Sequence, residues 1–126
     1  ATHARQAAGR GAEIVVFPEL ALNGYPPRDL VEKPSFVERT TEALSHLAAE
    51  TAPLDVAIVC GYVGAAQPLD GKSVTNSAAV IEKGEIVFRQ HKMLLPTYDV
   101  FDEARYFRPA EKQALLEIRG RKIALT

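Results

Sequence analysis

The stretch EIVVFPELALNGYPP, residues 13–27, decides how the rest of the sequence is interpreted. A run of β-branched and aromatic residues, 14–17, ends at Pro18, and a carboxylate, Glu19, follows at once. A continuous apolar run of this kind is typical of a strand that is buried on both faces. The stretch therefore predicts a buried strand with an acid at its carboxyl end, which is where open α/β sheets bind their ligands.

Helical and strand patterns alternate around this stretch. Residues 1–10 predict the end of a helix, and Gly11 stands where a helix stops. Pro34 opens a second helix that runs to about residue 51. Strands are predicted at 54–64, in a hairpin over 76–92 with its turn at Lys83-Gly84, and at 114–118 and 122–126, which are joined across 119–121. This order predicts an α/β fold with helices packed on the faces of sheets.

Bulk properties exclude several classes of protein. The chain has 126 residues, 47% of them hydrophobic and 25% charged, which is typical of one globular domain or of part of one. The net charge of −1 gives no basic surface for nucleic acid, and no apolar segment approaches the ~18 residues of a membrane span. The chain opens inside a helical pattern and closes inside a strand pattern, so we expect a fragment of a longer protein.

Three further features predict no chemistry of their own. Residues 66–73, AQPLDGKS, match a phosphate-binding loop only loosely, and they lack its glycines and its following helix, so we expect a surface loop. Cys60, the single cysteine, lies inside a predicted strand, where a thiol is usually a small core residue with a raised pKa. The histidines are scattered without ligand spacing, so no metal site is predicted.

Glu19 and Lys92 are the remaining candidates. A desolvated carboxylate at position 19 can have a raised pKa and act as a general base, or it can cap a helix or brace a loop. Lys92 ends the hairpin strand, where it can balance negative charge in a buried site or protect a sheet edge from aggregation. The pattern of residues leaves these alternatives open and does not pair the two side chains.

Three stretches resemble one family in the same order and spacing. FPELALNGYPPRDLV, GKSVTNSAAVIEKGEIVFRQHK and KMLLPTYDVFDEARYF are similar to the carbon–nitrogen hydrolase (nitrilase) superfamily. Within it, they most resemble the glutaminase domains of glutamine-dependent NAD synthetases. The resemblance implies a nitrilase-like α-β-β-α layered sandwich, incomplete over residues 1–126, with the first strand, the second half and the synthetase domain all absent from this chain.

The superfamily uses a Glu–Lys–Cys triad, and the resemblance implies two of its members. Glu19 is the implied general base, and Lys92 the implied stabiliser of the tetrahedral oxyanion. Glu103 matches a second buried glutamate beside the triad, and Tyr25 and Tyr98 match tyrosines of the glutamine pocket. These three are therefore the implied substrate-binding residues.

The nucleophilic cysteine of the family follows a strand like RKIALT within a few residues. The resemblance therefore places it beyond Thr126, and we expect the chain by itself to be inactive. Thr97 departs from the asparagine that many relatives carry near the pocket.

The resemblance also implies a function for the parent protein. Hydrolysis of the glutamine amide would supply ammonia without a cofactor, and a synthetase domain with ATP and Mg²⁺ would use it to amidate deamido-NAD to NAD. We expect a homo-oligomer in the cytoplasm. The single cysteine is compatible with that reducing compartment. Two alternatives stay open: a stand-alone amidase or carbamoyl hydrolase, and a catalytically inert domain that acts only in assembly.

Overall fold

A four-stranded mixed sheet forms the centre of the computed structural model, which describes residues 1–69, 72–98 and 101–126. Its strands, in spatial order, are β1 (Ile14–Val16), β2 (Ala57–Leu69), β3 (Lys72–Glu82) and β4 (Glu85–His91). β1 runs parallel to β2, whereas β2, β3 and β4 are antiparallel neighbours. The helix before β1 and the long helix between β1 and β2 make this the alternating order that the sequence predicted.

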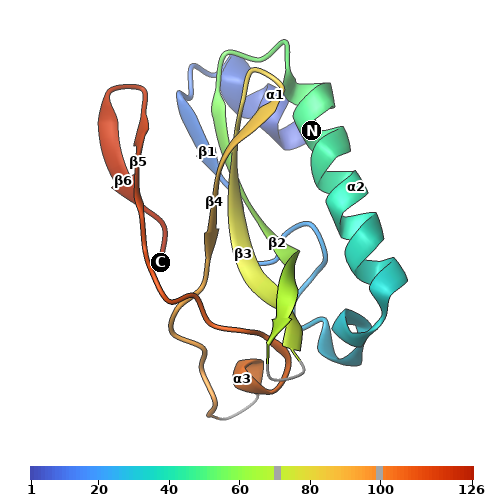
Figure 1. Cartoon of the computed structure of the whole chain (residues 1–126). Helices are drawn as coiled ribbons and strands as arrows, with labels where there is room; N and C mark the ends of the chain where they lie inside the picture. The colour runs from blue at the N-terminus through green and yellow to red at the C-terminus, as the bar shows by residue number, and fades with distance from the viewer. Residues whose placement is uncertain (70–71, 99–100) are drawn as a thin grey trace.

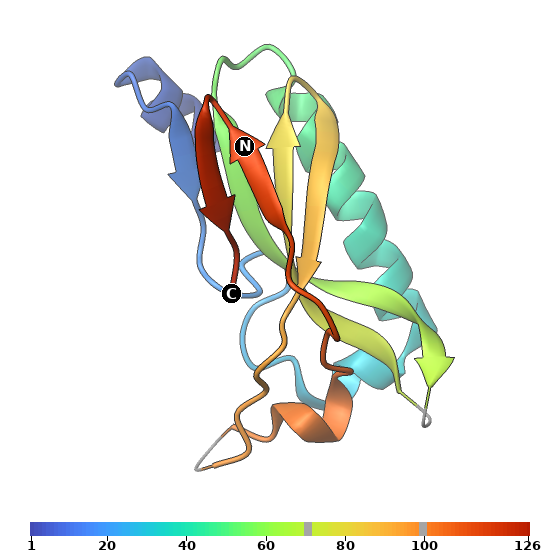
Figure 2. The ribbon, with the colours of Figure 1, turned by 60° about the vertical axis from the view of Figure 1, so that its left-hand side comes forward.

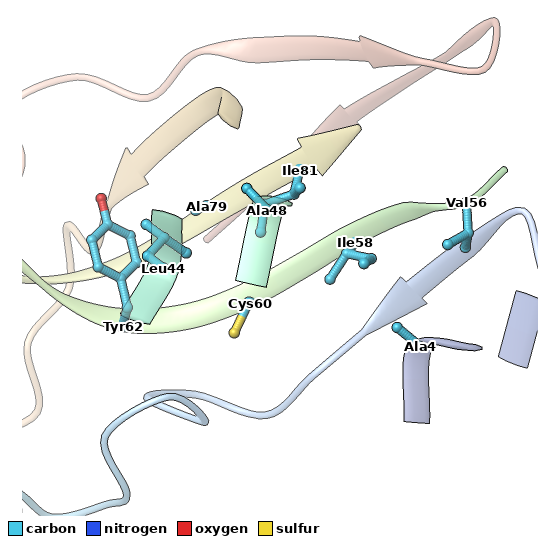
Figure 3. Close-up of a cluster of buried hydrophobic side chains, with 9 residues drawn as sticks. All are labelled: Ala4, Leu44, Ala48, Val56, Ile58, Cys60, Tyr62, Ala79 and Ile81. Atoms are coloured by element: carbon cyan, nitrogen blue, oxygen red, sulfur yellow. The ribbon is translucent and has the colours of Figure 1, made fainter. Parts of the chain in front are cut away.

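Helices cover one face of this sheet (Figure 1). These are α1 (Thr2–Gly9) and α2 (Pro34–Thr51), which begins with Pro34 as predicted. Their buried side chains, such as Ala4 and Leu44, meet those of β2 and β3 in one apolar cluster (Figure 3). No helix in the described part of the chain has the length and apolar character needed to cross a bilayer.

A small second sheet covers the opposite face (Figures 1 and 2). It is the hairpin of β5 (Leu115–Ile118) and β6 (Arg121–Ala124). Ile118 is fully buried against Ala57, Val59 and Val80 of the central sheet. Helices, central sheet and small sheet are three successive layers of the predicted α-β-β-α sandwich, so the predicted fold class is confirmed.

Both predicted hairpin turns are present. Lys83 and Gly84 have φ angles of 49° and 86°, and Arg119 and Gly120 have 51° and 73°. Positive φ at both central residues is the geometry that matches the twist of two-residue hairpins. Short helical segments lie at the other end of the sheet, namely the 3₁₀ helix η1 (Arg28–Glu32) and the single turn α3 (Glu103–Tyr106).

Two predictions about the strands are wrong. Residues 65–69 and 72–73 are not a loop, because β2 continues to Leu69 and β3 begins at Lys72, with Ala65 paired to Val74. The ladder passes Pro68 through a register shift, which is where a sheet tolerates a proline. Asp70 and Gly71, the rest of this predicted loop, lie outside the described residues.

The second error concerns β1, which is not buried on both faces. Ile14 packs under the small sheet and Val15 under the helices, but Val16 is 71% exposed. Val16 lies at the end of the strand and borders an open cleft, so nothing in the described structure covers it.

Candidate active site

The turn after β1 presents Glu19 and is held against β2. Before the turn, the Phe17 N–H donates to the Val59 carbonyl at 2.8 Å. After it, the Leu22 N–H donates to the Gly61 carbonyl at 3.1 Å. Because both hydrogen bonds reach the same buried strand, they fix the backbone on either side of Glu19.

Gly61 leaves the space that this turn occupies. A β-carbon at position 61 would lie 2.9 Å from the Pro18 carbonyl oxygen and 3.0 Å from the Glu19 carbonyl carbon, and closer still to the Leu20 nitrogen. The next residue, Leu20, is fully buried and has a φ of 48°, a conformation that non-glycine residues rarely adopt. The sequence pattern did not reveal Gly61, since a glycine inside a strand signals only some close backbone approach.

Asn23 anchors the far end of the same turn. Its side-chain oxygen accepts the Val63 N–H of β2 at 2.9 Å, and its amide group donates to the Thr40 hydroxyl of α2 at 2.5 Å. The turn is therefore tied to the sheet on one side and to the long helix on the other.

Lys92 directly follows β4, as the sequence predicted. Its N–H donates to the Asn76 carbonyl of β3 at 2.8 Å, and its own carbonyl accepts the Ala110 N–H at 3.0 Å. The side chain is 24% exposed and points toward the Glu19 turn, so its ammonium group lies between Glu19 and Glu103.

Glu103 begins α3 and is 4% exposed. Its backbone N–H donates to the Pro96 carbonyl at 3.1 Å. One carboxylate oxygen accepts the Tyr25 hydroxyl at 2.9 Å.

Four side chains from four separate segments meet here, and we call Glu19, Asn76, Lys92 and Glu103 the acid–lysine cluster. The Lys92 ammonium lies 2.6 Å from Glu19 Oε1 and 3.1 Å from Glu103 Oε2. The amide group of Asn76 donates to Glu19 Oε1 at 2.5 Å and to Glu103 Oε2 at 3.3 Å. Sequence reasoning missed Asn76, although the polar run 75–77 inside an apolar strand was a visible signal.

The ionisation state of Glu19 differs from the prediction. Burial by itself raises the pKa of Glu19, but hydrogen bonds from Lys92 and Asn76 and the charge of Lys92 outweigh it. The pKa is therefore held below its ordinary value, and not raised as the sequence allowed for a desolvated carboxylate. A carboxylate that is ionised at neutral pH is able to accept a proton.

Lys92 is shifted in the opposite direction. Burial lowers the pKa of Lys92, yet the hydrogen bonds and charges of Glu19 and Glu103 overcome it and raise the pKa above its usual value. The side chain is consequently a permanent cation at physiological pH, and it is available to stabilise negative charge nearby.

An open cleft of about 270 Å³ lies beside the cluster. Its walls include Glu19, Asn76 and Lys92 together with residues 124–126 at the end of β6. Figure 2 shows this end of the chain beside the segment that follows β1. Thr126 therefore lies at the same cleft as the acid and the lysine, although it is 107 positions from Glu19 in a sequence of 126 residues.

The two predicted tyrosines differ in position. Tyr25 donates a hydrogen bond from its hydroxyl to Glu103 and so lies directly beside the acid–lysine cluster. Tyr98 is 69% exposed, and the Phe101 ring lies 5.7 Å from the Tyr98 ring and 6.2 Å from the Tyr25 ring. Four of the five sequence-predicted site residues thus come together, and Tyr98 lies at the rim.

Cys60 is buried in the apolar cluster that the helices cover (Figure 3), and it is not among the residues that line the cleft. Burial raises the pKa of its thiol, as the sequence predicted. In the residues that the structure describes, no three His, Cys, Asp or Glu side chains gather as a metal site requires.

The sequence profile described as carbon-nitrogen hydrolase matches residues 1–125. The chain belongs to the carbon–nitrogen hydrolase family. Among curated relatives of this chain, a glutamine-dependent NAD(+) synthetase from Synechocystis is 48% identical over 99% of the chain and 23% of the relative. One from Thermotoga maritima is 38% identical over 97% of the chain and 20% of the relative. The chain spans about a fifth of the length of these relatives.

Solved structures of the same family confirm the predicted nitrilase-like fold. The glutamine-dependent NAD+ synthetase from Acinetobacter baumannii, in complex with ADP, superposes with a TM-score of 0.80 at 33% identity, over 98% of this chain and 22% of that chain. A mutant amidase of the nitrilase superfamily from Nesterenkonia AN1 superposes with a TM-score of 0.81 at 26% identity, over 98% of this chain and 45% of the amidase chain.

Proposed function

We propose that this chain carries the general base and the oxyanion-stabilising lysine of a glutamine amide hydrolase. One observation carries the proposal: the Lys92 ammonium is held 2.6 Å and 3.1 Å from the carboxylates of Glu19 and Glu103, beside the cleft that Thr126 lines. We further propose that the residues following Thr126 in the full-length protein bring the cysteine nucleophile to this cleft.

In this mechanism, the Glu19 carboxylate takes the thiol proton, and the thiolate attacks the amide carbon of glutamine. The oxygen of the amide gains a negative charge that Lys92 stabilises, and this charge exists only after the attack. Glu19 returns the proton to the departing nitrogen, which leaves as ammonia. Water then hydrolyses the thioester and releases glutamate.

The other cluster residues have supporting roles in the proposal. Glu103 is buried and holds the side chain of Lys92 with a second carboxyl contact beside that of Glu19. Tyr25 binds Glu103 and, with Tyr98 at the rim, forms the wall against which the substrate side chain would lie. Glutamine binding by Tyr25, Tyr98 and Glu103 is therefore part of the proposal.

The parent protein is proposed to be a glutamine-dependent NAD synthetase, because the curated relatives carry that name. This chain would be part of its glutaminase domain, which needs no cofactor. Ammonia would pass to a synthetase domain that uses ATP and Mg²⁺ to convert deamido-NAD to NAD. A homo-oligomer in the cytoplasm remains part of the proposal.

Substitution of Lys92 tests the role of the cation. We expect Lys92→Ala in the full-length protein to lower kcat for glutamine hydrolysis about 10²- to 10³-fold, the usual effect of removing one oxyanion donor. Glutamate release is the measurement, and Lys33→Ala is the control, since Lys33 is an exposed lysine at the start of α2. Unchanged hydrolysis by Lys92→Ala would refute the assignment.

A stand-alone amidase is the second candidate, because an amidase structure superposes on nearly the whole chain. The full-length protein should then hydrolyse small aliphatic amides such as propionamide in preference to glutamine. Preference for glutamine supports the glutaminase, and hydrolysis of neither substrate supports the inert assembly domain.

A further inference from the structure

Asn76 contacts the three other members of the acid–lysine cluster. Its side-chain amide group donates to Glu19 Oε1 at 2.5 Å and to Glu103 Oε2 at 3.3 Å. Its backbone carbonyl accepts the backbone N–H of Lys92 at 2.8 Å. The residue is only 3% exposed. We propose that Asn76 is a positioning residue that holds Glu19 and Glu103 on Lys92, a role that rests on the proposed function of the cluster.

The charges of the cluster explain why a neutral donor is needed there. The carboxyl groups of Glu19 and Glu103 share a single ammonium group, so their oxygens need a further hydrogen-bond donor. A carboxamide carries two N–H donors and no charge, and it bridges both acids without adding a second cation that would compete for Lys92. Because both neighbours are carboxylate oxygens, the nitrogen of the amide, and not its oxygen, faces them.

The backbone of Asn76 couples the positions of the base and the lysine. Its carbonyl receives Lys92 one step beyond the last β3–β4 pair, Ser77 with His91. On its other side, Asn76 is paired with Val63 of β2, whose N–H anchors the Glu19 turn through Asn23. One residue of the central strand therefore sets the distance between the turn after β1 and the end of β4.

Loss of the amide donor should change the titration of Glu19 in a defined direction. The groups around Glu19 are Lys92 from the end of β4, Glu103 from α3 with Tyr25 behind it, and His91, which lines the cleft. Without Asn76, the desolvated Glu19 carboxylate has one hydrogen-bond donor fewer, so its ionised form is less stabilised. The acid limb of kcat/KM for glutamine hydrolysis should therefore move to higher pH.

Three variants of the full-length protein test the role. Asn76→Leu keeps the shape and removes the donors, Asn76→Asp keeps the size and adds a negative charge, and Thr75→Val removes buried hydrogen bonds one residue away. For Asn76→Leu we expect kcat to fall roughly ten- to a hundredfold, the range for a lost hydrogen bond to a charged group, with KM little changed. The acid limb of kcat/KM should move to higher pH in Asn76→Leu, and it should move further in Asn76→Asp. Thr75→Val should keep the wild-type pH profile.

Crystal structures of the full-length variants separate this role from the proposed function. We expect the Glu19–Lys92 contact of 2.6 Å to open beyond about 4 Å in Asn76→Leu, or in Asn76→Asp if the leucine variant does not fold. An intact contact, or a pH profile that Thr75→Val alters equally, would overturn the role of Asn76. If the wild type does not hydrolyse glutamine, the proposed function fails, and the contact in the variants still decides the role of Asn76.

Discussion

Glu19 lies in a turn whose uncommon backbone conformation is imposed by the surrounding residues. Leu20, the next residue, has a φ of 48° although it is a fully buried leucine. Uncommon backbone angles of this kind persist only where surrounding contacts determine them, and they cluster at functional sites. Here the contacts are the hydrogen bonds to β2 and the close approach to Gly61.

Gly61→Ala should displace Glu19 without touching it. The new methyl group would lie within 3.0 Å of backbone atoms of the turn, so the turn must move away from β2. We expect a loss of about 1–3 kcal/mol of stability, as for other overpacked sites, and a large fall in glutamine hydrolysis. Thermal unfolding and glutamate release of the full-length protein are the measurements.

Gly9→Ala is the matched control for that variant. Gly9 ends α1, and a β-carbon at this position would meet no neighbouring group within 4 Å, so alanine should leave activity unchanged. Equal hydrolysis by the Gly61 and Gly9 variants would contradict the view that the turn needs this glycine.

The pH dependence of hydrolysis follows from the two shifted residues. The pKa of Glu19 is held below its ordinary value of 4.5, so its ionised form, and the stability that this form contributes, should be lost only as pH falls through that lower pKa. The pKa of Lys92 is raised above 10.5, so its charge persists throughout the working range. The acid limb of kcat/KM should therefore lie below pH 4.5.

The far-UV circular dichroism of the same protein, measured at each pH, corrects this profile for unfolding in acid. An acid limb near about pH 6, where tuned catalytic glutamates titrate, would mean that burial and not Lys92 dominates the pKa of Glu19.

At the scale of elements, the two hairpin turns differ in one respect that can be measured. Gly84 and Gly120 both have positive φ, but only a methyl group on Gly84 would collide with a neighbour, the Ala52 side chain, at 2.8 Å. Gly120→Ala should lower the free energy of unfolding by about 1–2 kcal/mol, because alanine is strained in the left-handed backbone conformation. Gly84→Ala should cost more, because α2 must also move.

Thermal unfolding of the full-length variants gives this comparison directly. A Gly120 variant that is destabilised as much as the Gly84 variant would show that the contact between the hairpin and α2 carries no strain.

Local chemistry explains which elements were predictable from the sequence. Glycine in two-residue turns and proline at the start of a helix act through their own backbone, so both hairpins and the beginning of α2 could be predicted. The extension of β2 and β3 through residues 65–69 and 72–73 could not, because Pro68 reads as a strand breaker. There the long antiparallel ladder overrides the local preference.

At the scale of the whole molecule, the site is built from segments that no spacing rule connects. Glu19 and Lys92 are 73 positions apart and were paired only through the resemblance to a family. Asn76 was not predicted, because the polar run 75–77 does not show which side chain it faces until β3 is placed beside the Glu19 turn. Tyr98 was predicted by the same resemblance but lies at the exposed rim.

The most direct test of the proposed function is a single substitution measured with two nitrogen donors. In the full-length protein, Glu19→Gln removes the base but keeps the size of the side chain. We predict that NAD synthesis from glutamine falls about 10²- to 10⁴-fold, the usual contribution of a general base, while synthesis from added ammonia stays at the wild-type rate. Glutamine-dependent synthesis at the wild-type rate in Glu19→Gln would contradict the central claim.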